Sequence, residues 1–285
     1  MKKVLAVCAV CAAAVFASAA EDGKPVVEEV DDGAYFLDPY FDFQTELHFY
    51  SAYVWRGRII CDRPVWQPAQ DIYVNLGEDA AYGRLKVRLW ADFYINGHRP
   101  PHRFGGMSIV DETVSYTKTF LENIDFEVGH IGYQYPNRHA SGMRDTDELF
   151  TGVRWRNPYL TPKVYVWWDY GSNSHNAENC LFFDFDFSHT FVLTKELSLN
   201  VGGGFGVANG PYMENYTVGQ INGPAFNYFH NDVALYYRLT DWLKVGGSLS
   251  YFYNLSRQVR HSNYDLNDAY NAGILRGGVH FVANF

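Results

Sequence analysis

Residues 41–55 read Phe-Asp-Phe-Gln-Thr-Glu-Leu-His-Phe-Tyr-Ser-Ala-Tyr-Val-Trp, and this stretch decides the fold. Its odd positions hold mostly large apolar side chains, whereas the even positions hold Asp42, Gln44, Glu46 and His48. Successive side chains of a β-strand point to opposite faces of the sheet. The stretch therefore predicts a strand with one apolar face and one ionisable face.

The same two-residue period recurs along the chain, for example in 84–96 and 181–191. Continuing in this way predicts twelve strands: 40–56, 66–76, 84–96, 108–120, 123–134, 147–157, 163–171, 180–193, 196–208, 228–239, 242–254 and 274–285. Most have at least the roughly 9–11 residues that a tilted membrane crossing needs. An even strand number is typical of bacterial outer-membrane barrels.

The connections between these strands alternate in length. Short ones lie around 77–83, 121–122, 157–162, 194–195 and 240–241, and longer polar ones lie at 57–65, 97–107, 135–146, 172–179, 209–227 and 255–273. Short periplasmic turns and long external loops are typical of outer-membrane barrels. We therefore expect an all-β, transmembrane, antiparallel up-and-down β-barrel with both termini in the periplasm. Aromatic residues should mark its interfaces, with Trp55, Trp66, Tyr251 and Tyr253 at the outer one and Phe41, Trp155, Trp242 and Phe285 at the inner one.

The composition agrees with a barrel that has an apolar outer surface and a polar interior. The chain has 22 Tyr, 21 Phe and 7 Trp, yet its mean hydropathy is only −0.24. Past the N-terminus no apolar run reaches the roughly 18–20 residues of a spanning helix. A soluble β-sandwich also alternates, so composition alone does not decide. The net charge of −9 argues against a nucleic-acid partner.

The N-terminus predicts a secretory signal peptide over residues 1–19. Two lysines precede an apolar run, which ends at Ala17-Ser18-Ala19. The alternative of a lipoprotein signal lacks a proper motif before Cys8 or Cys11. We expect an acidic periplasmic segment over 20–39 and the barrel, embedded in outer-membrane lipid, over 40–285. The last strand ends at Phe285, which resembles the signal that such barrels present to the barrel assembly machinery.

The polar face of the strands should line the lumen, and its charges fall into two sets. Basic residues lie toward the periplasmic strand ends, namely Arg84, Lys86, Arg88, Arg154, Arg156, Lys163, Arg238 and Lys244. Acidic residues lie in the outer halves, namely Asp92, Asp111, Asp169, Asp184, Asp186 and Asp232. The exceptions are Asp42, Glu46, Asp125 and Glu127, of which Asp125 and Glu127 can pair across strands with Arg154 and Arg156.

Two interpretations of these charges remain open. They either line a pore that selects ions or solutes, or they pair with one another and close the interior. Twelve strands lie between the ~8 that leave room only for side chains and the ~16–18 of wide porins. We therefore favour a narrow channel.

Small inward residues on two strands leave space in the predicted lumen. They are Ser198, Asn200, Gly202, Gly204, Gly206 and Ala208 on one strand, and Gly246, Ser248 and Ser250 on another. The space can hold water, the loop 209–227 or the segment 21–39. The glycines can instead serve the curvature of the sheet.

Two cysteines, Cys61 and Cys180, remain after the signal is removed. An oxidising compartment permits a disulfide between them. Sequence alone does not place their Cα atoms close enough for one, so the disulfide stays an alternative.

Residues 51–57, Ser-Ala-Tyr-Val-Trp-Arg-Gly, are followed by Pro64 and by Gln67-Pro68. This stretch resembles the N-terminal hairpin of the TorF family of porins. The resemblance covers about residues 47–75, rests on Ser51, Tyr53, Trp55, Arg56, Gly57 and Pro64, and implies an outer-membrane channel without naming a solute. Cys61 has no counterpart in the pattern.

Enzymatic and metal chemistry find little support. Some twelve-stranded outer-membrane barrels are phospholipases with Ser, His and Asn on the lipid-facing surface. Here the nearest sequences, Ser174-His175-Asn176 and His261-Ser262-Asn263, fall in predicted loops, where a nucleophile and its base are not held together. Five loop histidines, His98, His102, His139, His175 and His261, lack a fixed ligand spacing.

We therefore expect a non-enzymatic outer-membrane channel for passive diffusion of small polar or ionic solutes, without a cofactor or metal. The alternative is a closed structural or adhesive barrel that acts through its extracellular loops. The sequence leaves the solute and the oligomeric state open.

Overall fold

The computed structural model describes residues 40–95, 106–136, 145–171, 180–216, 224–256, 259–260 and 273–285. The expected signal peptide, the acidic segment 20–39, the five loop histidines and both Ser/His/Asn sequences lie outside the described residues. Among the helices that are described, none has the length and apolar character needed to cross a membrane.

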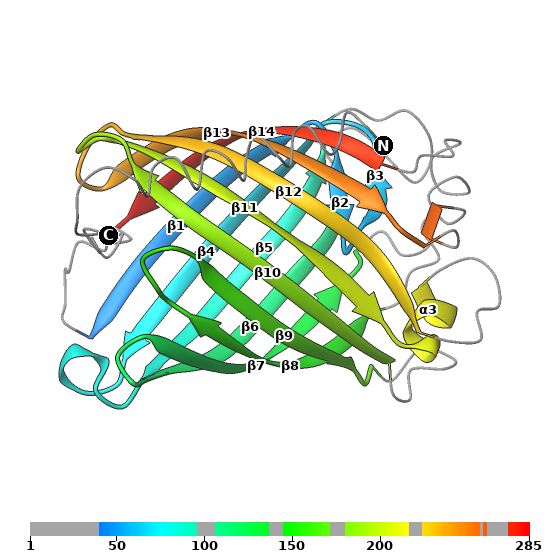
Figure 1. Cartoon of the computed structure of the whole chain (residues 1–285), viewed down its shortest axis with the longest axis horizontal. Coiled ribbons are helices and arrows are strands. Elements are labelled where there is room, and N and C mark those ends of the chain that lie inside the picture. Colours follow the sequence, from blue (N-terminus) through cyan, green and yellow to red (C-terminus); the bar gives the residue numbers. More distant parts are fainter. Residues whose placement is uncertain are drawn as a thin grey trace.

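Twelve antiparallel strands close into one barrel (Figure 1). Neighbouring strands of the barrel follow one another in the sequence, and β1 pairs with both β4 and β14, which closes the sheet. The barrel strands are β1 (Phe41–Tyr50), β4 (Val65–Asn75), β5 (Arg84–Tyr94), β6 (Met107–Phe120), β7 (Ile124–Gln134), β8 (Thr146–Trp155), β9 (Thr161–Asp169), β10 (Cys180–Val192), β11 (Leu197–Ala208), β12 (Ala225–Arg238), β13 (Leu243–Asn254) and β14 (Gly273–Asn284). The predicted closed antiparallel barrel of twelve strands is confirmed.

Each strand separates an apolar outer face from a polar inner face. On β5, Leu85, Val87 and Leu89 are exposed on the outside. Arg84 and Arg88, on the opposite face, form ion pairs with side chains of neighbouring strands. Because adjacent residues of a strand point to opposite faces, the alternation in the sequence becomes the distinction between the outer surface and the lumen.

The two ends of the barrel differ. At one end the strands are joined by short turns, and the C-terminus lies there; we name this the short-turn end (Figure 1). A 3-10 helix, Glu78–Ala80, occupies one of these turns. The other, long-connection end carries the helix α3 (Gly210–Tyr216) and a small second sheet (Figure 1).

That second sheet corrects the prediction for the first strand. β1 ends at Tyr50 rather than at residue 56, and β2 (Tyr53–Trp55) pairs instead with β3 (Arg58–Cys61). The connecting residues Arg56 and Gly57 have φ angles of 47° and 78°. Two consecutive positive φ angles are typical of the tight type I′ hairpin turn. The connection between β1 and β4 is therefore a hairpin, which we name the hairpin plug (β2, β3 and their turn).

Candidate functional site

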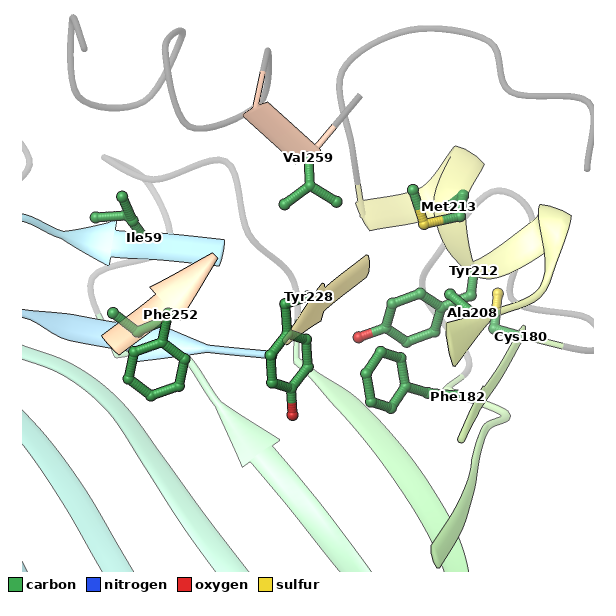
Figure 2. Close-up of a cluster of buried hydrophobic side chains, with 10 residues drawn as sticks. Ile59, Cys180, Phe182, Ala208, Tyr212, Met213, Tyr228, Phe252 and Val259 are labelled. Atoms are coloured by element: carbon green, nitrogen blue, oxygen red, sulfur yellow. The ribbon is translucent and has the colours of Figure 1, made fainter. Parts of the chain in front are cut away.

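One face of the hairpin plug packs against the wall formed by β10 to β13. Val54 and Ile59, which are register partners in the hairpin, contribute to a buried apolar cluster (Figure 2). The other members of this cluster are Cys180, Phe182, Ala208, Tyr212, Met213, Tyr228, Phe252 and Val259. Burial of large apolar and aromatic side chains is the main favourable term in packing, so this cluster holds the hairpin to that wall.

The opposite face of the hairpin plug packs against β4 to β7. Tyr53 and Cys61 belong to a second buried cluster, whose barrel members are Val65, Tyr94, Ile109 and Tyr133. The two clusters use opposite walls of the barrel. The hairpin plug therefore lies across the lumen near the long-connection end.

The tip of the hairpin is fixed by a buried ion pair. The two terminal nitrogens of Arg56 donate to the two carboxylate oxygens of Glu148 on β8, at 2.7 and 2.6 Å. Glu148 is fully buried and also accepts a 2.9 Å hydrogen bond from the Tyr133 hydroxyl. Burial acts to lower the pKa of Arg56, but the Glu148 carboxylate raises it well above its usual value. Paired, two-point contacts of this kind are strong and geometrically specific.

Aromatic rings surround the Arg56 guanidinium. Its central carbon lies 4.7 to 5.6 Å from four ring centroids, those of Trp55, Trp167, Phe182 and Tyr212. A cation over aromatic faces is stabilised more when it is removed from water. The Arg56–Glu148 pair and this ring cage together form the latch that holds the hairpin plug.

The residues that resemble the TorF pattern all lie in the connection that carries the hairpin plug. Ser51 Oγ accepts a 3.0 Å hydrogen bond from the Gly277 backbone N–H, and the Pro64 carbonyl accepts one from the Ile95 N–H. The prediction that Trp55 lies at the outer interface is wrong. Its ring packs inside the barrel against Tyr133 and Tyr216, because the chain turns inward after Tyr50.

Part of the loop 209–227 contributes to the same closure. The α3 helix begins at Gly210 after Asn209, whose side chain accepts from the Tyr212 N–H at 3.0 Å, as helix-capping residues do. Tyr212 and Met213 are buried, and Tyr216 donates to Asp169 of β9. The helical part of this loop therefore packs at the long-connection end of the barrel (Figure 1).

Many of the charges near the short-turn end are paired, largely with the four acidic residues that were expected as exceptions there. Five basic side chains form ion pairs with five carboxylates: Arg84 with Asp42, Lys86 with Glu127 at 3.6 Å, Arg88 with Glu46 and Asp71 at 2.8 and 2.7 Å, and Arg154 and Arg156 with Asp125 at 2.7 and 3.3 Å. The predicted pairing of Asp125 with Arg154 and Arg156 is thereby confirmed. Glu127, by contrast, pairs with Lys86, which lies two strands away.

The remaining predicted basic residues lie side by side. Lys163 of β9 is the register partner of Arg154, and Lys244 of β13 is the partner of Arg238. Like charges in adjacent strands repel one another. The register thus places two basic side chains next to each other at each of these two positions.

Five of the six predicted acidic residues make hydrogen bonds or ion pairs in the described structure. Asp92 accepts from Gln67 at 2.8 Å, and Asp184 accepts from the Tyr228 hydroxyl at 2.8 Å. Others interact with His230 or with hydroxyl groups, namely Asp186 and Asp232 in the first case and Asp169 in the second. Asp111 has a buried oxygen without a hydrogen-bond partner in the described structure.

Sequence reasoning missed three groups that matter here: Glu148, His230 and the His48–His280 pair. The His48 and His280 Nδ1 atoms lie 2.7 Å apart across β1 and β14, and Ser248 contacts His280. The signal for Glu148 was present, since it shares the inward parity of Arg154 on β8. That Glu148 would pair with Arg56, in the connection between β1 and β4, could not be inferred from this parity.

Cys61 and Cys180 are not joined by a disulfide, so that alternative is not realised. Both thiols are buried, but they belong to the two different clusters on opposite faces of the hairpin plug. A disulfide needs its Cα atoms within about 7 Å of each other.

The two thiols are expected to resist alkylation while the protein is folded. Burial raises the pKa of Cys61, in the hairpin plug, to about 11, so at pH 8 very little of it is the reactive thiolate. Mass spectrometry after iodoacetamide treatment should show no adduct on the folded processed chain. Two adducts should form in denaturant. A folded chain that reacts at once would contradict the closed packing around the hairpin plug.

Among the described residues, no cluster of three or more His, Cys, Asp and Glu side chains is arranged to hold a metal ion.

A scan against known protein families finds no match, and no curated protein matches the sequence. Solved structures do match. The COG4313 outer membrane channel from Pseudomonas putida F1 has a TM-score of 0.51 and 10% identity, covering 90% of this chain and 98% of the other. The barrel has the fold of an outer-membrane channel. At this identity the likeness concerns the fold alone.

Two further likenesses have lower scores. A NanC porin matches with a TM-score of 0.48 and 10% identity over 85% of this chain and 98% of the other. An active-site mutant of outer membrane phospholipase A from Escherichia coli matches with a TM-score of 0.48 and 13% identity over 93% and 94%.

Proposed function

We propose that this protein is an outer-membrane channel for small polar or ionic solutes, and that the hairpin plug holds it closed. The short-turn end then faces the periplasm, because periplasmic turns of such barrels are short. The exposed leucine, valine and phenylalanine side chains of the outer face contact lipid. The terminal strand, which ends at Phe285, is the part that we expect the barrel assembly machinery to engage.

The observation that carries this proposal is that some inward side chains beyond the hairpin plug remain partly exposed, although Asp42 and Asp125 among them are buried. Near the long-connection end Glu148 is fully buried. Toward the short-turn end the inward side chains of Asp186, Asp232, Arg84 and Arg154 are 31, 33, 37 and 44% exposed. A barrel that needed only stability could fill its whole interior with side chains, as ~8-stranded barrels do.

Small inward residues line one wall of the lumen, and some of them accommodate larger neighbours: a Cβ on Gly204 would meet Asp186, and one on Gly246 would meet Tyr236. Asn200, Gly202 and Gly204 lie on β11, and Gly246 and Ser248 lie on β13. They share the inward parity of Asp186 on β10 and Asp232 on β12, which are the register partners of Gly204 and Gly202. The candidate path therefore runs along this wall and ends at the hairpin plug.

Conductance of the full processed chain in planar bilayers tests the proposal. We expect discrete current steps of low amplitude, because the plug closes the lumen most of the time. Steps that grow when the latch is broken would support a gated channel.

Ion preference tests whether the charged residues line the path. Replacing Arg84, Lys86 and Arg88 by glutamine leaves their partners Asp42, Glu127, Glu46 and Asp71 without counter-charge. We expect the reversal potential in a potassium chloride gradient to move toward cation preference. Exchange of the half-buried Lys118, which faces outward and donates to the Ala81 carbonyl, is the control. An unchanged reversal potential would remove these side chains from the path.

The hairpin plug itself favours a second candidate, a closed structural or adhesive barrel that acts through its external loops. Its two faces are packed against opposite walls, as a permanent core would be. This candidate predicts silence in bilayers both for the wild type and for variants with a broken latch.

A further inference from the structure

Arg58, the first residue of β3, is a buried cation without a counter-charge in the described structure. It is only 7% exposed, and its Nε has no hydrogen-bond partner. Over the described ranges no carboxylate lies within ion-pair distance of Arg58, whereas Arg56, two residues before it, is paired with Glu148. A buried charge that is neither paired nor hydrogen-bonded is costly. The position therefore requires a partner.

After burial, the largest electrostatic effects on Arg58 come from tyrosine hydroxyl groups. These hydroxyl groups belong to Tyr212 and Tyr216 of α3, to Tyr135 directly after β7 and to Tyr53 of β2. Burial lowers the pKa of Arg58, in contrast to the raised pKa of Arg56. The two arginines of one turn thus differ in whether a carboxylate compensates them.

Some of these phenols can still donate a hydrogen bond. Tyr212 accepts from Arg56 at 3.1 Å, so its own hydroxyl hydrogen is not used in that contact. The hydroxyls of Tyr53 and Tyr135 make no hydrogen bond among the described residues. Tyr216 is different, because it already donates to Asp169.

These groups together match the chemistry of an oxyanion. A guanidinium offers parallel N–H donors that fit two oxygens of a carboxylate or phosphate group. Phenolic O–H groups add donors from the sides. We propose that Arg58, with Tyr53, Tyr135 and Tyr212, binds a small oxyanion, a carboxylate, phosphate or sulfate group, within the hairpin plug.

Asp111 is the nearest competing explanation. It acts on Tyr53 and Tyr135, as Arg58 does on Tyr135. The cations that act most strongly on Asp111, however, are Arg56 and Arg88 rather than Arg58. If Arg58 has an internal partner, removal of the arginine should lower the stability in anion-free buffer. If its partner is an external oxyanion, the removal should not lower it.

The experiment measures thermal unfolding and titration calorimetry of the full processed chain in detergent, with inorganic phosphate, sulfate and acetate as probes. We expect at least one of these anions to bind the wild type and to raise its unfolding temperature. Arg58→Met should weaken that binding by about tenfold or more, since a charge-assisted contact is lost. In anion-free buffer Arg58→Met should be at least as stable as the wild type.

Arg63→Met is the matched control, because Arg63 is exposed and, among the residues that the structure describes, forms an ion pair only with the adjacent Asp62, at 3.5 Å. Three results would overturn the proposal: no response of the wild type to any of the anions, equal binding by Arg58→Met, or a lower stability of Arg58→Met in anion-free buffer. The last result would mean that Arg58 already has an internal counter-charge.

That an anionic solute holds the hairpin plug in place as it binds is a consequence that rests on the proposed function. The binding measurement requires no current. A chain that binds phosphate but never conducts would retain the site and lose the channel, and the reverse outcome would retain the channel alone.

Discussion

Arg56→Ala is expected to produce large and long-lived current steps where the wild type gives small ones. Removal of the guanidinium leaves the Glu148 carboxylate buried without its partner, which typically costs about 3–5 kcal/mol. The ring cage of Trp55, Trp167 and Phe182 also loses its cation. Much of this cost is relieved when the hairpin plug leaves the lumen and water reaches Glu148. Single-channel recording and thermal unfolding of the same preparation measure both effects.

Two further variants separate the latch from general damage. Arg63→Ala removes an exposed arginine of the same connection and should change neither current nor stability measurably, since exposed pairs contribute little. Arg56→Met combined with Glu148→Leu removes both buried charges, so its stability should recover while its latch stays lost. A folded Arg56→Ala protein with wild-type currents would show that the hairpin plug does not control the path.

Gly57→Ala is expected to prevent the hairpin plug from seating. Gly57 has a φ of 78°, which costs a residue with a side chain roughly 1–2 kcal/mol. A Cβ added there would also lie 2.4 Å from the Cβ of Tyr228, far inside contact distance. Tyr228 belongs to the wall of the barrel and cannot easily move. We therefore expect a lower unfolding temperature together with open-channel currents like those of Arg56→Ala.

Gly277→Ala supplies the comparison for that variant. Gly277 lies on β14, and a Cβ placed there meets no atom within 4 Å. Its stability and conductance should match those of the wild type. If Gly57→Ala behaved like Gly277→Ala, the close approach of the hairpin tip to Tyr228 would not exist in the membrane.

Residues 41–55 show how far alternation alone can predict this structure. The two-residue period specifies a strand and its two faces, and it located the other eleven barrel strands to within three residues at each end. It does not say to which sheet a strand belongs. The period therefore ran from β1 through Tyr53 and Trp55, although those residues pair with β3. The missed signal was Arg56-Gly57, a two-residue turn before a second short apolar run.

The charges of the lumen show a second limit. Asp125 and Arg154 could be paired in advance because they lie on adjacent strands. Lys86 reaches Glu127 past β6, and Arg88 reaches Glu46 past β4. Such contacts depend on the stagger of the strands and on the curvature of the closed wall. Neither the stagger nor the curvature can be inferred from the sequence pattern of one strand.

The position of the hairpin plug in the chain also bears on how the barrel is made. The plug follows the first strand, yet the partners of its latch come much later: Glu148 is 92 residues from Arg56, and Tyr212 is 156 residues away. Contacts between such distant segments form late in folding, after the loops that separate them have closed. Early in biogenesis the hairpin plug can therefore pack only against β4 to β7, and its latch forms when the later strands arrive. Pairing of β1 with β14, which closes the barrel, then occurs close in time to docking of the hairpin plug. The newly closed barrel is therefore not left open in the membrane.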